Sequence, residues 1–272
     1  MKVEWVKTID SWKEWKNIAI FACNHWDEKV GLEVFSYLEK QFWLKNKLKI
    51  WKVYLIKVNI EACEKNKRFI DDNMNRIWNK EFKKWSYEFR RGEELKSILD
   101  DIDIAIDLHS VSKWNDVIWI TDIKYLDISK KFLDVETILV DDVWKTWALI
   151  WYLIRKWKVA FWLECWNHNS ENAYLNWVRN VLNFLIYYWF IDWKIKKEYS
   201  DILCLRFYKE IYPKTEKFRF SKDYSWFTKL WKWEIYAYDQ DVKYFEKKEV
   251  YIWLVAKNPE LNDGCWFIFN KI

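Results

Sequence analysis

The balance between tryptophan and glycine constrains this chain more than any other feature. Its 272 residues include 24 tryptophans and 3 glycines, whereas glycine ordinarily makes up about 7% of a globular protein, or roughly 19 residues at this length. Turns with positive φ depend on glycine, and only Gly31, Gly92 and Gly264 are present. Other residues must therefore stand where glycine ordinarily does.

The tryptophans fall where glycine is expected. Trp26, Trp162 and Trp166 lie at predicted strand ends and tight loops, where a bulky side chain is unfavourable. We interpret most tryptophans as UGA codons that the cell reads as glycine. Tryptophan and glycine together number 27, close to a normal glycine content plus a few true tryptophans. The alternative is a chain truly rich in tryptophan, with a stacking surface for sugars or nucleic acid.

Charge and cysteine content exclude several classes of protein. The 46 basic and 41 acidic residues are well mixed, with a net charge of +5, so we expect neither a nucleic-acid nor a membrane partner. The 5 cysteines include no C-x-x-C pair, which argues against a disulfide scaffold or a cysteine zinc site. The polar Met1–Asp10 segment is unlike a secretory signal, and the apolar run Val181–Phe190 is too short to cross a bilayer. We expect a cytoplasmic protein and leave open whether it is a monomer or a homodimer.

Short β-rich runs alternate with helical stretches, which is the pattern of an α/β layer fold. The predicted strands are Asn17–Ala22, Val53–Val58, Ile102–Asp107, Val117–Ile120 and Val159–Leu163. The predicted helices are Gly31–Gln41, Tyr87–Leu99 and Ala173–Tyr188. After residue 195 the pattern changes to short alternating segments, such as Glu234–Tyr238 and Glu249–Ala256. We therefore expect a large α/β domain over residues 1–195 and a small β domain over residues 196–272.

Three residues near predicted strand ends suit a metal ion. His25 and Glu28 form an H-x-x-E pair between the first strand and the next helix, so both side chains can converge on one ion. His109 ends an apolar strand, so its side chain emerges at the carboxyl edge where α/β enzymes build their sites. Two histidines and one glutamate leave a fourth position for water, as in catalytic zinc sites. Taken alone, the H-x-x-E pair is more often a surface histidine beside a helix cap, and His109 alone is explained equally well as a hydrogen-bonded histidine at a strand end.

Further polar residues supply what such a site needs. Glu164 ends the apolar run Val159–Leu163, and a carboxylate there can take a proton from a metal-bound water and pass it to a leaving nitrogen. Arg68, Asn75 and Arg76 lie between the first two predicted ligands and the third. They are donors suited to a carboxylate or a developing oxyanion. A single arginine is more often a surface residue, so these assignments depend on the set as a whole.

Five segments carry a resemblance to a known family. With glycine written for tryptophan, they read N-H-G-D-E at 24–28, R-F-I-D-D-N-M-N-R at 68–76, Y-E-F-R-R-G-E-E-L at 87–95, I-D-L-H-S at 106–110 and G-L-E-C-G at 162–166. In this order and spacing the chain resembles the succinylglutamate desuccinylase and aspartoacylase family. H-x-x-E with a later D-L-H is shared with zinc carboxypeptidases in general, whereas the other three elements are more specific. The resemblance is clear over residues 17–180 and weaker beyond them.

The resemblance implies a zinc-carboxypeptidase-like α/β catalytic domain, with a mixed central sheet flanked by helices, and a small C-terminal β domain that shapes substrate access. It implies one zinc ion per chain and a substrate carboxylate bound by side chains. The zinc ligands would be His25, Glu28 and His109. The other roles would fall to Glu164 as general base and acid, to Arg68 as the group that polarises the scissile carbonyl, and to Asn75 and Arg76 as the substrate-carboxylate ligands.

Two further residues follow from the same resemblance. The segment K-Y-F-E-K-K-E at 243–249 resembles the family segment that contributes a substrate-contacting tyrosine, here Tyr244. The family carries an arginine ten residues before the catalytic glutamate, where this chain has Ile154, with Arg155 one place later. Either a one-residue shift puts Arg155 in that role, or the pocket binds an amino acid other than aspartate.

The sequence thus predicts hydrolysis of the amide bond of N-acyl amino acids, a small-molecule substrate, with a zinc-bound water as nucleophile and Glu164 as base. One alternative is a zinc carboxypeptidase, which a panel of peptides beside N-acyl amino acids separates. Another is a non-catalytic binding or nucleic-acid protein. The presence of Glu164 and all three predicted ligands argues against the latter, and salt-sensitive, chelator-insensitive binding to single strands would support it.

Overall fold

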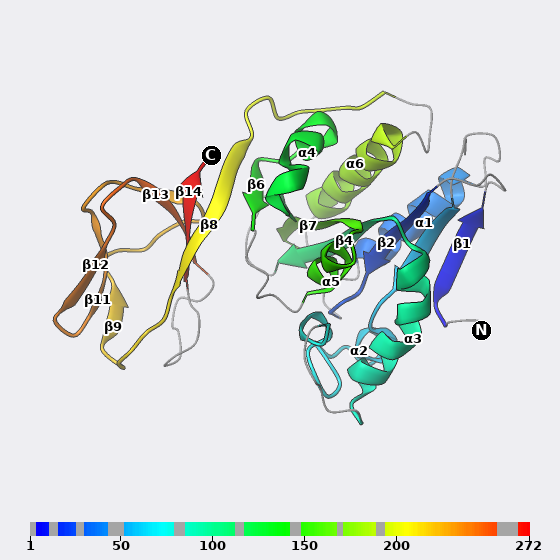
Figure 1. Cartoon of the computed structure of the whole chain (residues 1–272), viewed down its shortest axis with the longest axis horizontal. Helices are drawn as coiled ribbons and strands as arrows, with labels where there is room; N and C mark the ends of the chain where they lie inside the picture. Colours follow the sequence, from blue (N-terminus) through cyan, green and yellow to red (C-terminus); the bar gives the residue numbers. More distant parts are fainter. Residues whose placement is uncertain are drawn as a thin grey trace. The chain divides into compact units, whose positions relative to one another are not determined.

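The computed structural model describes residues 4–10, 16–25, 30–42, 52–78, 85–111, 117–141, 148–167, 171–188, 194–254 and 266–272. The chain divides into two compact units (Figure 1). The first contains residues 1–138 and 143–202, and the second contains residues 139–142 and 203–272. The assignment of residues 1–195 as a catalytic domain and residues 196–272 as a small β domain that shapes access stays a prediction.

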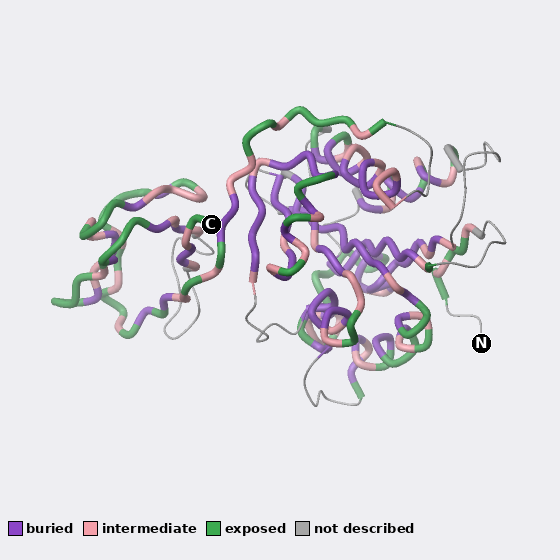
Figure 2. The backbone as a smooth tube through the Cα atoms, turned by 45° about the horizontal axis from the view of Figure 1, so that its top comes forward, coloured by how far each residue is buried: buried purple, intermediate pink, exposed green. Residues whose placement is uncertain are grey.

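The first unit is built on a mixed sheet with the strand order β1-β3-β2-β4-β7-β5-β6, in which the last two residues of β6, 139 and 140, belong to the second unit. Its strands are β1 (Val6–Asp10), β2 (Asn17–Ala22), β3 (Lys52–Lys57), β4 (Ile104–Val111), β5 (Val117–Thr121), β6 (Thr137–Val140) and β7 (Val159–Asn167). The four central strands β3, β2, β4 and β7 are parallel, while β1 and β5 pair antiparallel with β3 and β7. The apolar runs that predicted these strands are buried (Figure 2), as expected for parallel strands covered on both faces.

Helices cover both faces of this sheet (Figure 1). The helices are α1 (Val30–Phe42), α2 (Ile60–Lys65), α3 (Tyr87–Asp101), α4 (Leu126–Phe132), α5 (Leu149–Arg155) and α6 (Glu171–Tyr187), with the 3-10 turns η1 (Met74–Arg76) and η2 (Ile123–Tyr125). On one face α6 contacts α1 and α4. On the other, α3, α5 and η1 share one hydrophobic cluster with Ala19 and Phe21 of β2. The predicted α/β class, a mixed central sheet flanked by helices with a small C-terminal β region, is confirmed.

Both glycines in the described residues lie inside helices rather than in turns. A Cβ atom at Gly31 would lie 2.6 Å from Cβ of Ala22, so a larger residue there would push α1 away from β2. Neither Gly31 nor Gly92 has a positive φ. The described glycines therefore serve close packing, and other residues make the left-handed turns.

Tryptophan takes three of the seven positive-φ positions among the described non-glycine residues, namely Trp5 (52°), Trp157 (63°) and Trp233 (66°). Trp157 lies two residues beyond Arg155, the last residue of α5, and is 90% exposed. Its N–H and that of the next residue donate back to carbonyls of the last helical turn, a helix ending in which glycine is the usual residue at this position. These backbones suit glycine, and the interpretation that the cell reads such positions as glycine stays a prediction.

The second unit consists of short antiparallel strands. They are β8 (Leu203–Ile211), β9 (Phe218–Phe220), β10 (Thr228–Leu230), β11 (Ile235–Asp239), β12 (Val242–Phe245), β13 (Val250–Leu254) and β14 (Trp266–Lys271). They pair in the orders β8-β14-β13-β10 and β12-β11-β9. A separate apolar cluster that includes Tyr236 and Ile252 forms the core of this unit. Within the described parts of the whole chain, no helix has both the length and the apolar character needed to cross a membrane.

Candidate active site

The carboxyl edge of the parallel strands brings together three of the predicted site residues. His25 lies just beyond β2, His109 lies near the end of β4, and Glu164 lies on β7 as the direct register partner of His109. The imidazole centroids of His25 and His109 are 6.0 Å apart. All three side chains are buried. The fourth predicted residue, Glu28, lies outside the described residues.

A buried carboxylate holds the ring of His109. Oδ2 of Asp107 lies 2.9 Å from Nε2 of His109. His109 follows Asp107 by two residues on β4, so both side chains lie on the same face of the strand. Nδ2 of Asn24 donates to both carboxylate oxygens of Asp107, at 2.8 and 2.9 Å. Sequence reasoning assigned no role to Asp107 or Asn24. The signal was present, because residues i and i+2 of a strand share a face.

An amide holds the second ring. Nε2 of His25 lies 3.2 Å from Oδ1 of Asn73, and the same oxygen accepts the backbone N–H of Asn75 at 2.9 Å. Sequence reasoning missed Asn73 as well, since nothing in its position along the chain ties it to His25. Both histidines therefore present Nε2 to a side-chain oxygen. Such hydrogen bonds fix the orientation of metal-binding histidines in proteins.

The segment 68–76 carries the three predicted donors. Arg68 and Arg76 are exposed, and desolvation, followed by the positive charge of Arg68, lowers the pKa of the Arg76 guanidinium. Asn75 is buried, and its Oδ1 accepts the backbone N–H of Leu149 at the start of α5, at 3.2 Å. Through Asn73, the structure places this segment against His25.

Two neighbours of Glu164 shape its surroundings. The ring of Trp162 stacks at 4.4 Å from that of His109, and its Nε1 donates to Oε1 of Glu164 at 3.1 Å. With glycine at position 162, neither contact would form. Burial, and next the negative charge of Glu164, raises the pKa of the Cys165 thiol. This thiol stays protonated at neutral pH and is a poor nucleophile.

The structure does not bring Arg155 to this edge. It ends α5, before β7 begins at Val159, whose N–H donates to the carbonyl of Asp103 next to the start of β4. Five strand residues of roughly 3.3 Å each separate Val159 from Glu164. Among the described residues, neither Nη atom of Arg155 has a hydrogen-bond partner, and burial lowers its pKa. The end of α5 thus lies near the amino edge of the sheet, and the predicted role of Arg155 in substrate binding stays a prediction.

Tyr244 lies in the second unit, on β12. Its ring contacts those of Phe218 and Tyr236, at centroid distances of 5.9 and 6.3 Å. It is partly buried against the core of that unit. Its predicted contact with substrate stays a prediction.

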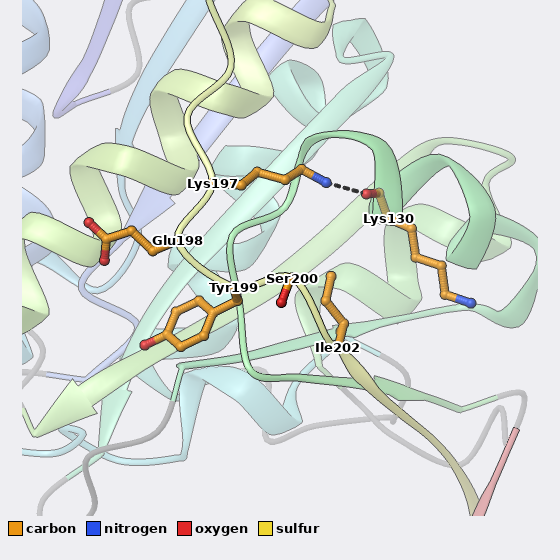
Figure 3. A pocket seen from close by; sticks show the side chains of 6 residues that line it. All are labelled: Lys130, Lys197, Glu198, Tyr199, Ser200 and Ile202. Atoms are coloured by element: carbon orange, nitrogen blue, oxygen red, sulfur yellow. Dashed lines mark hydrogen bonds between the residues drawn. The ribbon is translucent and has the colours of Figure 1, made fainter.

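Elsewhere, the described residues offer little that could serve as a second site. Within the described residues, no group of three or more histidine, cysteine, aspartate or glutamate side chains forms a complete metal site. A cavity of about 420 Å³ lies beside α4 and the segment that follows α6 (Figure 3). It is lined by Lys130, Lys197, Glu198, Tyr199, Ser200 and Ile202. None of these is a predicted site residue, and Nζ of Lys197 donates to the carbonyl of Lys130 at 2.5 Å.

Solved structures share the fold over nearly the whole chain. A succinylglutamate desuccinylase from Vibrio parahaemolyticus superposes with a TM-score of 0.77 at 15% identity, over 98% of this chain and 86% of that one. The ectoine utilization protein EutE (DoeB) from Ruegeria pomeroyi, in a product-bound structure, gives 0.74 at 13% identity, over 97% and 88%. A succinylglutamate desuccinylase/aspartoacylase from Rhodobacter sphaeroides gives 0.74 at 13%, over 98% and 89%.

The sequence was also compared with curated proteins and with profiles of protein families. No protein of curated function matches the chain. Residues 14–135 match the family profile described as the succinylglutamate desuccinylase/aspartoacylase catalytic domain. This range contains His25, His109 and the segment 68–76. The resemblance drawn from the sequence motifs is therefore confirmed over residues 14–135, which match the catalytic-domain profile of the succinylglutamate desuccinylase/aspartoacylase family.

Proposed function

We propose that the protein is a zinc-dependent deacylase that hydrolyses the amide bond of N-acyl amino acids. The observation that carries this proposal is the meeting of His25, His109 and Glu164 at one buried strand edge, with the two imidazoles 6.0 Å apart. Buried polar groups are costly to keep and cluster at functional sites. The match of residues 14–135 to the catalytic-domain profile of the succinylglutamate desuccinylase/aspartoacylase family supports the reaction class.

The donor set fits one zinc ion per chain. His25 and His109 would contribute nitrogen ligands to the ion, and the Nε2 contacts to Asp107 and Asn73 would orient both rings. Glu28 would complete a set of two histidines and one carboxylate. When bound, zinc lowers the pKa of a coordinated water towards 7 and polarises a carbonyl.

The chain's own residues would do the rest. Glu164 would take the proton from the attacking water and deliver it to the leaving nitrogen. Arg68 would donate to the oxyanion that develops on the acyl carbonyl. Asn75 and Arg76 would bind the carboxylate of the amino acid. Desolvation lowers the pKa of Arg76, but an arginine in a protein keeps its charge at neutral pH.

The test is hydrolysis of a pooled set of N-acyl amino acids, with C-terminal peptides as a second pool. The protein is produced in a host that decodes UGA as glycine, and each pool is assayed with and without a metal chelator. The proposal expects chelator-sensitive release of one free amino acid from the first pool, abolished in Glu164→Gln.

The other outcomes are equally informative. Chelator-sensitive cleavage of the peptide pool alone would make the protein a carboxypeptidase. Absence of hydrolysis of either pool by folded, zinc-loaded protein would contradict the proposal. Salt-sensitive binding to single-stranded nucleic acid, unaffected by chelator, would then favour a non-catalytic role.

A further inference from the structure

Glu88 is a fully buried carboxylate on the second residue of α3, exposed by 0%. It accepts three consecutive backbone N–H groups: Ile70 donates to Oε1 at 2.6 Å, and Asp71 and Asp72 donate to Oε2 at 3.1 Å each. Nδ2 of Asn59 donates to Oε1 at 3.2 Å. A charged acceptor of several N–H groups is among the stronger uses of a buried carboxylate.

The segment 70–72 also holds the start of α3 through a carboxylate of its own. Oδ2 of Asp71 accepts the backbone N–H of Tyr87, at the first residue of α3, at 2.8 Å. The helix start and the segment 70–72 thus hold each other through two carboxylates. A helix N-terminus favours negative charge on both.

From this anchor the structure leads directly to the active site. Residue 73 follows the three anchored amides, and Oδ1 of Asn73 contacts Nε2 of His25 at 3.2 Å. The same oxygen accepts the N–H of Asn75, and Oδ1 of Asn75 in turn accepts the N–H at the start of α5. One buried carboxylate therefore fixes the backbone that positions both a histidine ring and a predicted substrate ligand.

We propose that Glu88 is a positioning residue for the active site, acting through the segment 70–75 and Asn73 on the ring of His25. This inference rests on the proposed function for the identity of the site, but the positioning of His25 by Glu88 can be measured without catalytic turnover. If the carboxylate is lost, Asn73 no longer holds His25 in a single orientation. Binding of a metal by His25 then becomes weaker.

Glu88→Gln tests the proposal, with Glu93→Gln as the matched control. Glutamine replaces one acceptor oxygen by an N–H₂ group that opposes the amides of residues 70–72. Glu93 lies on the same helix, but its side chain is 47% exposed and pairs with Lys96. We expect about 10- to 100-fold weaker binding of Zn²⁺ alone in Glu88→Gln, faster hydrogen exchange at the amides of Ile70, Asp71 and Asp72, and a raised KM. Glu93→Gln should match the unmodified protein in all three.

A second pair of variants serves if Glu88→Gln does not fold. Asn73→Leu removes the acceptor for His25 and should weaken zinc binding by a similar factor, whereas Asn73→Asp keeps an acceptor oxygen and should restore it. Unchanged zinc affinity and amide exchange in Glu88→Gln, or equal affinity in Asn73→Leu and Asn73→Asp, would overturn the proposal. Neither readout needs hydrolysis, so a protein that binds zinc but cleaves no N-acyl amino acid would refute the proposed function and leave this inference standing.

Discussion

The two edges of the sheet in the first unit differ in how their polar side chains are placed: they are buried at the carboxyl edge and exposed at the amino edge. At the carboxyl edge the polar side chains of Asn24, Asp107 and His109 are buried and bonded to one another. At the amino edge Lys156 and Asp100 form a pair at 2.5 Å with side chains 37% and 61% exposed. Burying polar groups costs free energy that exposed pairs avoid.

This difference indicates that the carboxyl edge, rather than the amino edge, is the functional edge of the sheet. Exposed charged residues, such as those at the amino edge, are enough to end a strand and cost little free energy. The buried network at the carboxyl edge is not needed to terminate β2, β4 and β7. Its cost is understandable if it holds side chains in the orientation that a reaction requires.

The largest effect is expected at Glu164. Glu164→Gln keeps the shape of the side chain but removes its basicity, so hydrolysis should fall by about 10² to 10⁴ in kcat. Steady-state kinetics on the substrate identified from the pools measures it. The free energy of unfolding should be no lower than that of the unmodified protein, and retention of full activity would remove Glu164 from the mechanism.

The next effect is expected at Asp107. Asp107→Asn replaces the carboxylate that faces Nε2 of His109, so zinc affinity should weaken by about 10- to 100-fold. Competition with a chromophoric chelator measures the affinity. Asp100→Asn, at the amino edge, is the control and should bind zinc as the unmodified protein does. Equal losses in both variants would mean that the two edges do not differ as described.

A smaller effect, on stability, is expected beside the amino edge. Trp157 has a φ of 63° and is 90% exposed, and a left-handed backbone costs a side-chain-bearing residue about 1–2 kcal/mol. Trp157→Gly should therefore raise the free energy of unfolding by about 1 kcal/mol, because the greater freedom of glycine in the unfolded chain offsets part of the gain.

Urea denaturation measures this change, and buried Trp151 provides the contrast. Trp151→Gly should lower the free energy of unfolding by about 3–5 kcal/mol. Peptide mass spectrometry of protein from its own cells would show which of the two positions carries glycine. Destabilisation by Trp157→Gly would count against the glycine interpretation at that position.

The smallest effect is expected at the exposed pair. Lys156→Ala should change the free energy of unfolding by less than about 1 kcal/mol and leave hydrolysis unchanged. The hydrogen bond to Asp100 is the largest cause that raises the pKa of Lys156 above its ordinary 10.5. The small contribution of this pair to the free energy of unfolding is therefore complete below pH 10.5 and is lost as the pH rises through the raised pKa of Lys156. A loss of activity in Lys156→Ala would contradict the comparison.

The sequence predicts the central strands and longest helices because apolar periodicity determines them directly. It predicts His109 and Glu164 at the same edge because both end apolar runs, and parallel strands align their ends. It does not predict the roles of Glu88 and Asn73. Glu88 stands among exposed glutamates in Y-E-F-R-R-G-E-E-L, and only the tertiary contact with residues 70–72 distinguishes it. Arg155 was assigned from its spacing to Glu164 alone, and spacing along the chain does not reveal at which edge of a sheet a short helix ends.

The most direct test of the account is a zinc titration of protein stripped of metal, followed by hydrolysis of the identified N-acyl amino acid. We predict that activity rises in proportion to added zinc, stops rising at one equivalent per chain, and is absent in His109→Ala at the same zinc concentration. Full activity without zinc, or one equivalent still bound and active in His109→Ala, would show that the carboxyl edge of this sheet is not the metal-dependent deacylase site.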